Sequence, residues 1–433
     1  MKILLHFRQS TFISRSNGKK MKVLWFNISE PSRYAGDDKV TLGWQDSLEV
    51  LLSNQDIELH IAFESTLYDE KRNVGNVTYH PITTNYSWWE KKKAQWDWSI
   101  CENKVIKGAL KVVEEVQPQI IHVWGNEWPY GLIAAYTNIP VVVHIQGSII
   151  PYNNALYPPG YNIYNLILSG WNNPLYLWRL WKRTNKAKSR LRMEKKVWDV
   201  VKNYMGRTEW DRALVNILCP HANYFHVNEA LRPAFINSEY QWRIKTRKKI
   251  KLFTTGMNSF WKGPDMLLKT AKILISLNID FEWYVAGEMN NIIRKTVEKK
   301  EKSTFEQNNV HILGFLKPEE LINQLCDTTI YVHCAYIENS PNSICEALYL
   351  GVPVISTNVG GISSLINNGD DGILLPSNDP WQMANSIIEL SNNTERQIFL
   401  SNNGQVSAKE RHKAENIISQ LVKCYAQIIT DKP

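Results

Sequence analysis

Short runs rich in apolar and β-branched residues recur along this chain, and segments with helical periodicity separate them. Such runs cover residues 21–27, 57–63, 119–124, 140–145 and 224–227, and then residues 250–255, 281–285, 310–313, 329–334 and 352–356. Continuously apolar strands that alternate with helices are typical of parallel sheets covered on both faces. The alternation therefore predicts an α/β protein with two doubly wound parallel sheets, whose ligands would bind beyond the strand ends.

A polar and basic stretch over residues 229–249 separates the two sets of runs and reads as a linker. We expect one Rossmann-like domain over residues 21–228 and a second over residues 250–405. Residues 1–20 lack any strand or helix period, which indicates a disordered N-terminal extension. The last segment, residues 406–433, has apolar residues at helical spacing and predicts a final helix.

Composition excludes several classes of protein. No apolar run approaches the roughly 18–20 residues that span a bilayer, and the six cysteines show no C-x-x-C spacing, so we expect a reduced, cytoplasmic protein. The absence of a G-x-G-x-x-G motif after a strand and of a P-loop disfavours a dinucleotide oxidoreductase and a P-loop enzyme. The sequence has no D-x-D motif and no cluster of His and Cys at metal-ligand spacing, so we expect no metal site. We also expect no nucleic-acid partner.

Two glutamates eight positions apart, Glu338 and Glu346, flank an expected helix start. Ser340 reads as its N-cap, Pro341 as its first residue and Gly351 as its end. Free amides at a helix start attract phosphate, and the carboxylates accept hydrogen bonds from hydroxyls. The segment predicts a nucleotide-sugar site, although glutamates at this spacing are also common as solvated surface residues.

The motifs around these glutamates resemble, in order, the retaining group 1 glycosyltransferases of the GT-B superfamily. They are Gly256, residues 262–268, 285–288, 351–362 and 371–375, and the similarity is strong over residues 251–376 and looser from residue 21 onward. The resemblance implies two Rossmann-like domains that face a cleft, with the last helix crossing back to the first domain. It also implies transfer of a sugar from a nucleoside-diphosphate sugar to a saccharide or lipid-linked acceptor, in cell-surface polysaccharide or glycolipid synthesis. Retention of configuration, without a metal or other cofactor, is implied as well.

The resemblance carries roles for individual residues of the second half. Lys262 would contact the donor phosphates, Glu338 the sugar hydroxyls and Glu346 the ribose hydroxyls. The backbone around the helix start and at a glycine pair would approach the donor; these residues are Ser340, Asn342, Ser343, Ile344, Gly360 and Gly361.

In the first half, Gly43 resembles the glycine loop that reaches the cleft, and His144 ends an expected strand where it would face the crevice. A buried histidine bonded to backbone is the alternative for His144. His122 and Glu127 are weaker candidates for the acceptor side.

The chain departs from the family pattern at two positions. Met257 stands where the family has an arginine after the strand, and Ser364 where it often has a glutamate. Arg207 is a candidate replacement for the missing cation, and an ion pair of Arg207 with Glu209 or Asp211 is the alternative.

Residues 171–192 contain seven basic residues and no acidic one, together with Trp171, Tyr176, Trp178 and Trp181. Tryptophan and tyrosine suit the lipid headgroup region, and the cations suit anionic lipid. The segment predicts peripheral binding to the inner face of the plasma membrane. The alternative is a helix whose aromatic side chains pack in the core.

Two other functions remain compatible with these residues. One is a non-catalytic sugar-nucleotide-binding or membrane-scaffold protein, in which the missing arginine marks decayed catalysis. The other is a sugar-nucleotide epimerase on the same fold.

Overall fold

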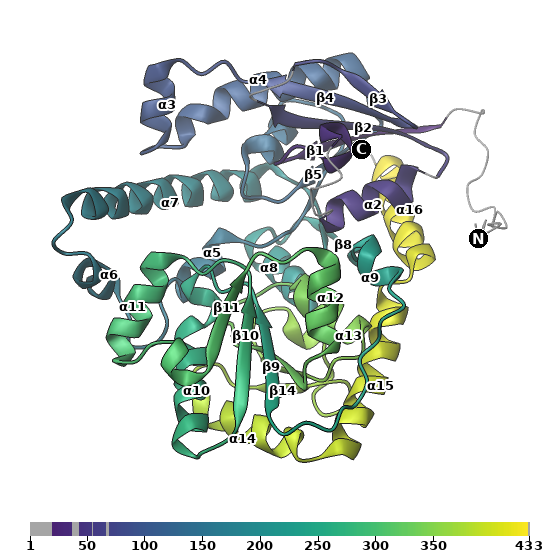
Figure 1. The fold of residues 1–433 in the computed structure, drawn as a ribbon. Coiled ribbons are helices and arrows are strands. Elements are labelled where there is room, and N and C mark those ends of the chain that lie inside the picture. Colours follow the sequence, from purple (N-terminus) through teal and green to yellow (C-terminus); the bar gives the residue numbers. More distant parts are fainter. Residues whose placement is uncertain (1–19, 37–42, 54, 66–68, 432–433) are drawn as a thin grey trace.

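Two sheets of mainly parallel strands, each covered by helices, form the chain (Figure 1). The computed structural model describes residues 20–36, 43–53, 55–65 and 69–431. The expectation for the N-terminal extension therefore lies almost entirely outside the described residues. Among these residues, no helix combines the length and the apolar content needed to cross a bilayer.

The first sheet has eight strands in the order β3-β4-β2-β1-β5-β6-β7-β8. Its strands are β1 (Met21–Asn27), β2 (Ile57–Ser65), β3 (Arg72–Val74), β4 (Val77–Thr83), β5 (Ile120–Trp124), β6 (Val141–His144), β7 (Asn203–Gly206) and β8 (Asn223–His226). All neighbours pair in parallel except β3 and β4, which form an antiparallel hairpin at one edge. The sequence did not indicate this hairpin or β7, because these strands are short or polar.

The helices of this half are α1 (Ser32–Ala35), α2 (Trp44–Ser53), α3 (Trp88–Ala94), α4 (Ser99–Val116), α5 (Ile149–Tyr152), α6 (Ile163–Ser169), α7 (Pro174–Val200) and α8 (Glu209–Leu218). A short helix, α9 (Pro233–Ile236), lies in the segment that joins the two sheets.

The second sheet has six parallel strands in the order β11-β10-β9-β12-β13-β14. They are β9 (Ile250–Thr255), β10 (Phe281–Ala286), β11 (Val310–Gly314), β12 (Ile330–His333), β13 (Val354–Thr357) and β14 (Ile373–Leu375). The strand order reverses direction between β9 and β12, and such a switch point opens a crevice beyond the carboxyl ends of the strands.

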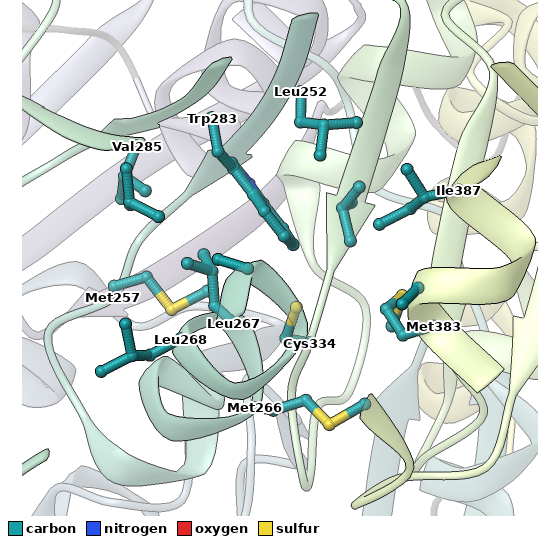
Figure 2. Packing of buried hydrophobic residues seen from close by; sticks show 14 of the residues in the cluster. Leu252, Met257, Met266, Leu267, Leu268, Trp283, Val285, Cys334, Met383 and Ile387 are labelled. Atoms are coloured by element: carbon teal, nitrogen blue, oxygen red, sulfur yellow. The ribbon is translucent and has the colours of Figure 1, made fainter. Parts of the chain in front are cut away.

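The helices of the second half are α10 (Pro264–Ser276), α11 (Asn291–Glu301), α12 (Pro318–Cys326), α13 (Asn342–Tyr349), α14 (Pro380–Ser391), α15 (Thr394–Arg411) and α16 (Ala414–Thr430). Strands β9 and β10 pack against α10 and α14 around the indole of Trp283, as Figure 2 shows. Its ring nitrogen donates to Thr254 Oγ1 at 2.9 Å, so the buried polar atom is satisfied.

Each half sends a segment into the core of the other. Helix α16 returns to the first sheet, where the Tyr425 hydroxyl accepts from Trp25 Nε1 at 2.9 Å and lies 2.6 Å from His122 Nδ1. In the other direction, Tyr161 and Leu166 are buried in the core of the second sheet. The Tyr161 hydroxyl donates to Glu301 at 2.7 Å. These exchanged segments hold the two halves together.

Candidate active site between the two halves

A hollow of about 320 Å³ lies where the first half meets the carboxyl edge of the second sheet. Residues before α2, at the end of β9, on α12 and at the start of α13 line it, together with one arginine of the joining segment. These are Gly43, Arg232, Thr255, Leu321, Leu325, Asn342, Ser343 and Glu346. The hollow thus unites Gly43 with three of the residues that the sequence placed around the donor.

The start of α13 presents two backbone donors to this hollow. No hydrogen bond joins the amides of Asn342 and Ser343 to another residue in the described part of the chain. The amide of Ile344 bonds to the Pro341 carbonyl at 3.0 Å, and its side chain is buried in the core. Two of the three expected amides are therefore available to an anion.

The expectation that Ser340 caps this helix is wrong. The N-cap is Pro341, and α13 begins at Asn342 without a side-chain cap. The Ser340 hydroxyl donates instead to Glu229 Oε1 at 2.9 Å. Ser340 therefore acts as a donor to a buried carboxylate and not as an acceptor for the amides of the helix.

Arg232 holds Glu346 in a two-pronged ion pair. Arg232 Nε lies 2.7 Å from Oε1 and Nη2 lies 2.8 Å from Oε2 of the carboxylate. Burial raises the pKa of Glu346, and the guanidinium offsets part of this rise. Sequence reasoning missed Arg232, because it lies 114 positions from its partner in a segment that reads as a basic linker.

Lys262 and Glu338 form an ion pair, with the Glu338 carboxylate largely buried. The turn after Lys262 needs glycine. Gly263 has φ +75, and a Cβ added there would lie 1.9 Å from the Cys334 carbonyl oxygen. The two residues expected to handle the phosphates and the sugar therefore lie in contact.

Gly360 and Gly361 approach the Glu338 loop. Gly360 has φ +55, and an added Cβ would lie 1.9 Å from the Glu338 carbonyl oxygen. The amide of Gly361 donates to the same oxygen at 2.9 Å. These glycines therefore allow a close approach to the backbone at Glu338, and they hold that backbone in place.

His144, which the sequence placed facing the crevice, does not line the hollow. Its ring is fully buried, with centroid distances of 5.1 Å to Trp44 and 4.9 Å to Trp124. Neither ring nitrogen has a hydrogen-bond partner among the described residues. Burial holds the pKa of His144 well below its usual value, so the ring is neutral.

Arg207 is buried behind the hollow and does not line it. Its guanidinium lies 4.7 Å from the Trp44 ring centroid and donates to the Gln146 carbonyl at 3.3 Å. Glu209 pairs with Arg212 instead, and Asp211 accepts from the Arg207 backbone amide at 2.8 Å. The Met257 side chain is buried in the core of the second half. Among the residues that the structure describes, the cations in contact with the site carboxylates are Arg232 and Lys262.

A further carboxylate lies near the junction on the side of the first sheet. Glu127 follows β5, and its Oε2 is buried without a hydrogen-bond partner among the described residues. Burial raises its pKa to about 7. Asn339, next to Glu338, reaches the same region: Thr208 Oγ1 donates to its Oδ1 at 2.9 Å, and its Nδ2 donates to the Gln146 carbonyl at 3.4 Å.

The fold also gathers Glu229, Cys345 and His412, whose potential metal-ligand atoms lie within 4.8 Å of one another. Sequence spacing gave no sign of this group. Arg411 Nη2 lies 3.4 Å from Glu229 Oε2, and the Cys345 thiol donates to Oε1 at 3.0 Å. The Arg411 guanidinium balances the charge of the Glu229 carboxylate, so no metal ion is needed there. The group joins the linker to α13 and to the turn before α16.

Residues 238–406 match the model of the family described as "Glycosyl transferases group 1". A relative from Bacillus anthracis, "N-acetyl-alpha-D-glucosaminyl L-malate synthase", is 24% identical over 191 residues. That match covers 44% of this chain and 49% of the relative, so the chain spans about half the length of the curated relatives that it matches.

Two solved structures share the whole architecture. Sucrose-phosphate synthase from Thermosynechococcus elongatus superposes with a TM-score of 0.71 at 13% identity, covering 95% of this chain and 100% of that one. Anabaena HepE in complex with UDP and glucose superposes with a TM-score of 0.61 at 13% identity, covering 94% and 99%. The fold is GT-B, as the sequence predicted.

Proposed function

We propose that this chain, a member of the group 1 glycosyltransferase family through residues 238–406, transfers a sugar from a nucleoside-diphosphate sugar to a hydroxyl of a saccharide or lipid-linked acceptor. One observation carries the proposal. The hollow between the two halves combines the Arg232–Glu346 pair with two free amides of α13, and Glu338 and Lys262 belong to the same edge of the second sheet.

The diphosphate is assigned to the start of α13. The free amides of Asn342 and Ser343, together with the partial positive charge of the helix end, favour an anion there. Lys262 adds a full charge. On donor binding, Lys262 exchanges its carboxylate partner for phosphate oxygens, and this exchange leaves Glu338 free to accept hydrogen bonds from the sugar hydroxyls.

The ribose is assigned to Glu346. Arg232 uses one lone pair of each carboxylate oxygen and fixes the plane of the group. The remaining lone pairs accept hydrogen bonds from two neighbouring hydroxyls. Arg232 thus acts as the positioning residue for this contact.

The transfer is proposed to retain configuration and to proceed without a metal. Stabilisation of the leaving diphosphate by Lys262 and the helix amides lowers the barrier where negative charge develops. The leaving phosphate takes the proton of the acceptor hydroxyl as the new glycosidic bond forms, so no side chain has to act as the base.

A thermal-shift screen of nucleotide sugars tests donor binding. UDP-linked glucose and N-acetylglucosamine come first, because HepE holds UDP and glucose and the Bacillus anthracis relative is named for an N-acetylglucosaminyl product. A donor at a hundred times its Kd should stabilise the fold by about 2.7 kcal/mol. Glu346→Ala should abolish the shift, and Glu338→Ala should lower kcat by roughly 10–100-fold, since an unpaired buried polar group costs ~1–3 kcal/mol.

The same donor separates the competing functions. A transferase converts it only with an acceptor or by slow hydrolysis, whereas an epimerase changes the sugar without releasing nucleotide. A binding protein shows the thermal shift and no turnover. If no nucleotide sugar stabilises the protein and both variants behave like the wild type, the site assignment is wrong.

A further inference from the structure

Three helices on one side of the first half expose an unusual number of large apolar side chains. Large side chains of three helices and of one turn are each between 44% and 68% exposed: Trp88 and Trp89 of α3, Tyr164 and Leu168 of α6, Trp171 in the turn before α7, and Leu175, Trp178 and Trp181 at the start of α7. We call these three helical segments, residues 88–94 and 163–188, the tryptophan surface. The alternative that the aromatic residues of 171–192 pack in the core is wrong for all three tryptophans.

The helices of this surface are in contact with one another. Trp96, which follows α3, lies against α7, with ring centroids 4.4 Å from Trp181 and 5.7 Å from Trp178. Tyr176 of α7 donates to the Leu166 carbonyl of α6 at 2.8 Å. Figure 1 shows α3, α6 and the N-terminal part of α7 on the same side of the molecule. Residues distant in the sequence therefore lie on one side of the molecule.

The fully buried residues of α7 lie in its second part, whereas in its first part Leu180 alone packs against a core as a partly buried side chain. The buried residues are Ser189, Met193, Glu194, Val197 and Trp198, all in the C-terminal half of the helix. The N-terminal half extends outward and keeps its indoles exposed. Large apolar side chains gathered on one water-facing side mark an interaction site.

The charge of the surface identifies the partner. Basic residues are interleaved with the indoles on both helices: Lys91, Lys92 and Lys93 on α3, and Arg179, Lys182, Arg183, Lys186 and Lys188 on α7. The acidic residue of α3, Glu90, pairs with Lys104 at 2.7 Å. Lys182 lies over the Trp178 ring at 4.4 Å. A second copy of this chain would bring like charges together, whereas an anionic lipid surface neutralises them.

We propose that the tryptophan surface docks this protein on an anionic lipid bilayer, with the indoles in the headgroup region and the lysine and arginine side chains on lipid phosphates. Indoles prefer the interface because they combine a large apolar ring with an N–H donor. Long basic side chains reach the phosphates while their methylene stems cover apolar surface. Helix α6 also connects this surface to the second half, because Lys299 of α11 donates a hydrogen bond to the Leu168 carbonyl at 2.7 Å.

Vesicle flotation of the full chain tests this proposal without any sugar transfer, so its failure is separable from failure of the proposed function. Vesicles of phosphatidylcholine mixed with an equal amount of phosphatidylglycerol should carry the protein upward, and pure phosphatidylcholine vesicles should not. High salt should weaken the binding, because ions screen exposed charges.

Two variants locate the contact. Replacing Arg179, Arg183, Lys186 and Lys188 by Ser should weaken vesicle binding at least about a hundredfold, since each basic residue near the surface contributes measurably. Trp88→Ser with Trp89→Ser and Trp171→Ser should weaken binding in both low and high salt. The matched control replaces four exposed basic residues elsewhere, Arg243, Lys248, Lys409 and Lys423, by Ser and should bind like the wild type.

Circular dichroism and thermal melting establish that each variant is folded. Absence of binding to the anionic vesicles at low salt overturns the proposal. So does equal loss in the control variant, which would indicate attraction by net charge alone. If sedimentation shows a dimer that the tryptophan substitutions dissociate, and vesicles are not bound, the surface joins two copies and the proposal fails.

Discussion

At the scale of single residues, Arg232 balances charge in the hollow, because it is the direct ion-pair partner of the buried Glu346. A buried ion pair stabilises little in itself, but removal of one partner leaves an uncompensated charge. The consequence of a substitution at Arg232 therefore depends on what is left at Glu346.

Arg232→Ala should lower the free energy of unfolding by roughly 3–5 kcal/mol, since Glu346 loses both hydrogen bonds in a buried place. The double variant Arg232→Ala with Glu346→Ala should be less destabilised than the sum of the single variants, measured by urea unfolding. Arg232→Lys should recover only part of the loss, because an ammonium cannot make the two-pronged contact. Additive losses would mean that the two side chains act independently.

The buried carboxyl of Glu127 should make the free energy of unfolding depend on pH. Burial raises its pKa to about 7, so the folded state holds a proton that the unfolded state releases near its ordinary value of 4.5. Stability from this group is complete at low pH and is lost as the pH rises through that window. As the pH rises from about 4.5 to 7, the free energy of unfolding of Glu127→Gln should therefore increase relative to that of the wild type, by up to about 3 kcal/mol.

Chemical unfolding of both proteins across this pH range checks the expectation. Asp211, whose pKa burial raises to about 6, is present in both and cancels in the difference. A difference that stays constant with pH would show that Glu127 titrates at its ordinary value when folded.

At the scale of elements, the loop that carries Glu338 is held by its neighbours. The glycine pair at the end of β13 reaches the Glu338 carbonyl, and Asn339 bonds to the first half. Lys262 meets the Glu338 carboxylate from the turn before α10. The glycine pair and the Asn339 contact fix the backbone of this loop, which makes it a rigid support for a sugar contact.

Gly360→Ala tests this support. Gly314 also has positive φ, at +73, but nothing lies within 4 Å of a Cβ added there, whereas at Gly360 the Glu338 carbonyl lies 1.9 Å away. Gly314→Ala should cost about 1 kcal/mol for its backbone conformation alone. Gly360→Ala should cost clearly more and should also lower kcat, measured by thermal unfolding and steady-state kinetics. Equal costs would show that the loop yields freely.

At the scale of the whole molecule, the two halves are tied by exchanged segments and by the buried group around Glu229. Helix α16 supplies Tyr425 to the first core, and α6 supplies Leu166 to the second. The buried Glu229 carboxylate meets α13 through Cys345 and the end of α15 through Arg411. If one half moves relative to the other, these contacts must either move with it or all break at once.

The same junction allows a test of metal independence. Sugar transfer should persist after removal of divalent ions by a chelator, because Lys262 and the α13 amides meet the phosphate charge. His412→Ala should not create or abolish a metal requirement, since Arg411 already balances Glu229. If the chelator abolishes transfer and added metal restores it, the prediction is wrong. If this metal requirement is then absent in His412→Ala, the ion binds at this junction.

The sequence by itself determined the fold class and most strands of the second sheet. The apolar runs that became β9, β10, β12 and β13 follow from local periodicity, which a chain carries in adjacent residues. The motif series around Glu338 and Glu346 indicated a group 1 glycosyltransferase, and the family match over residues 238–406 bears this out.

Only the tertiary structure decided which side chains meet. Arg232 reads as a linker residue until the fold brings it to Glu346. His144 loses its expected place in the crevice because Trp44 and Trp124 close over it. Ser340 lies one residue before the N-cap Pro341, and its hydroxyl donates to Glu229. Each outcome depends on a partner at least 20 positions away, and pairing and burial at that distance are properties of packing, which no local pattern encodes.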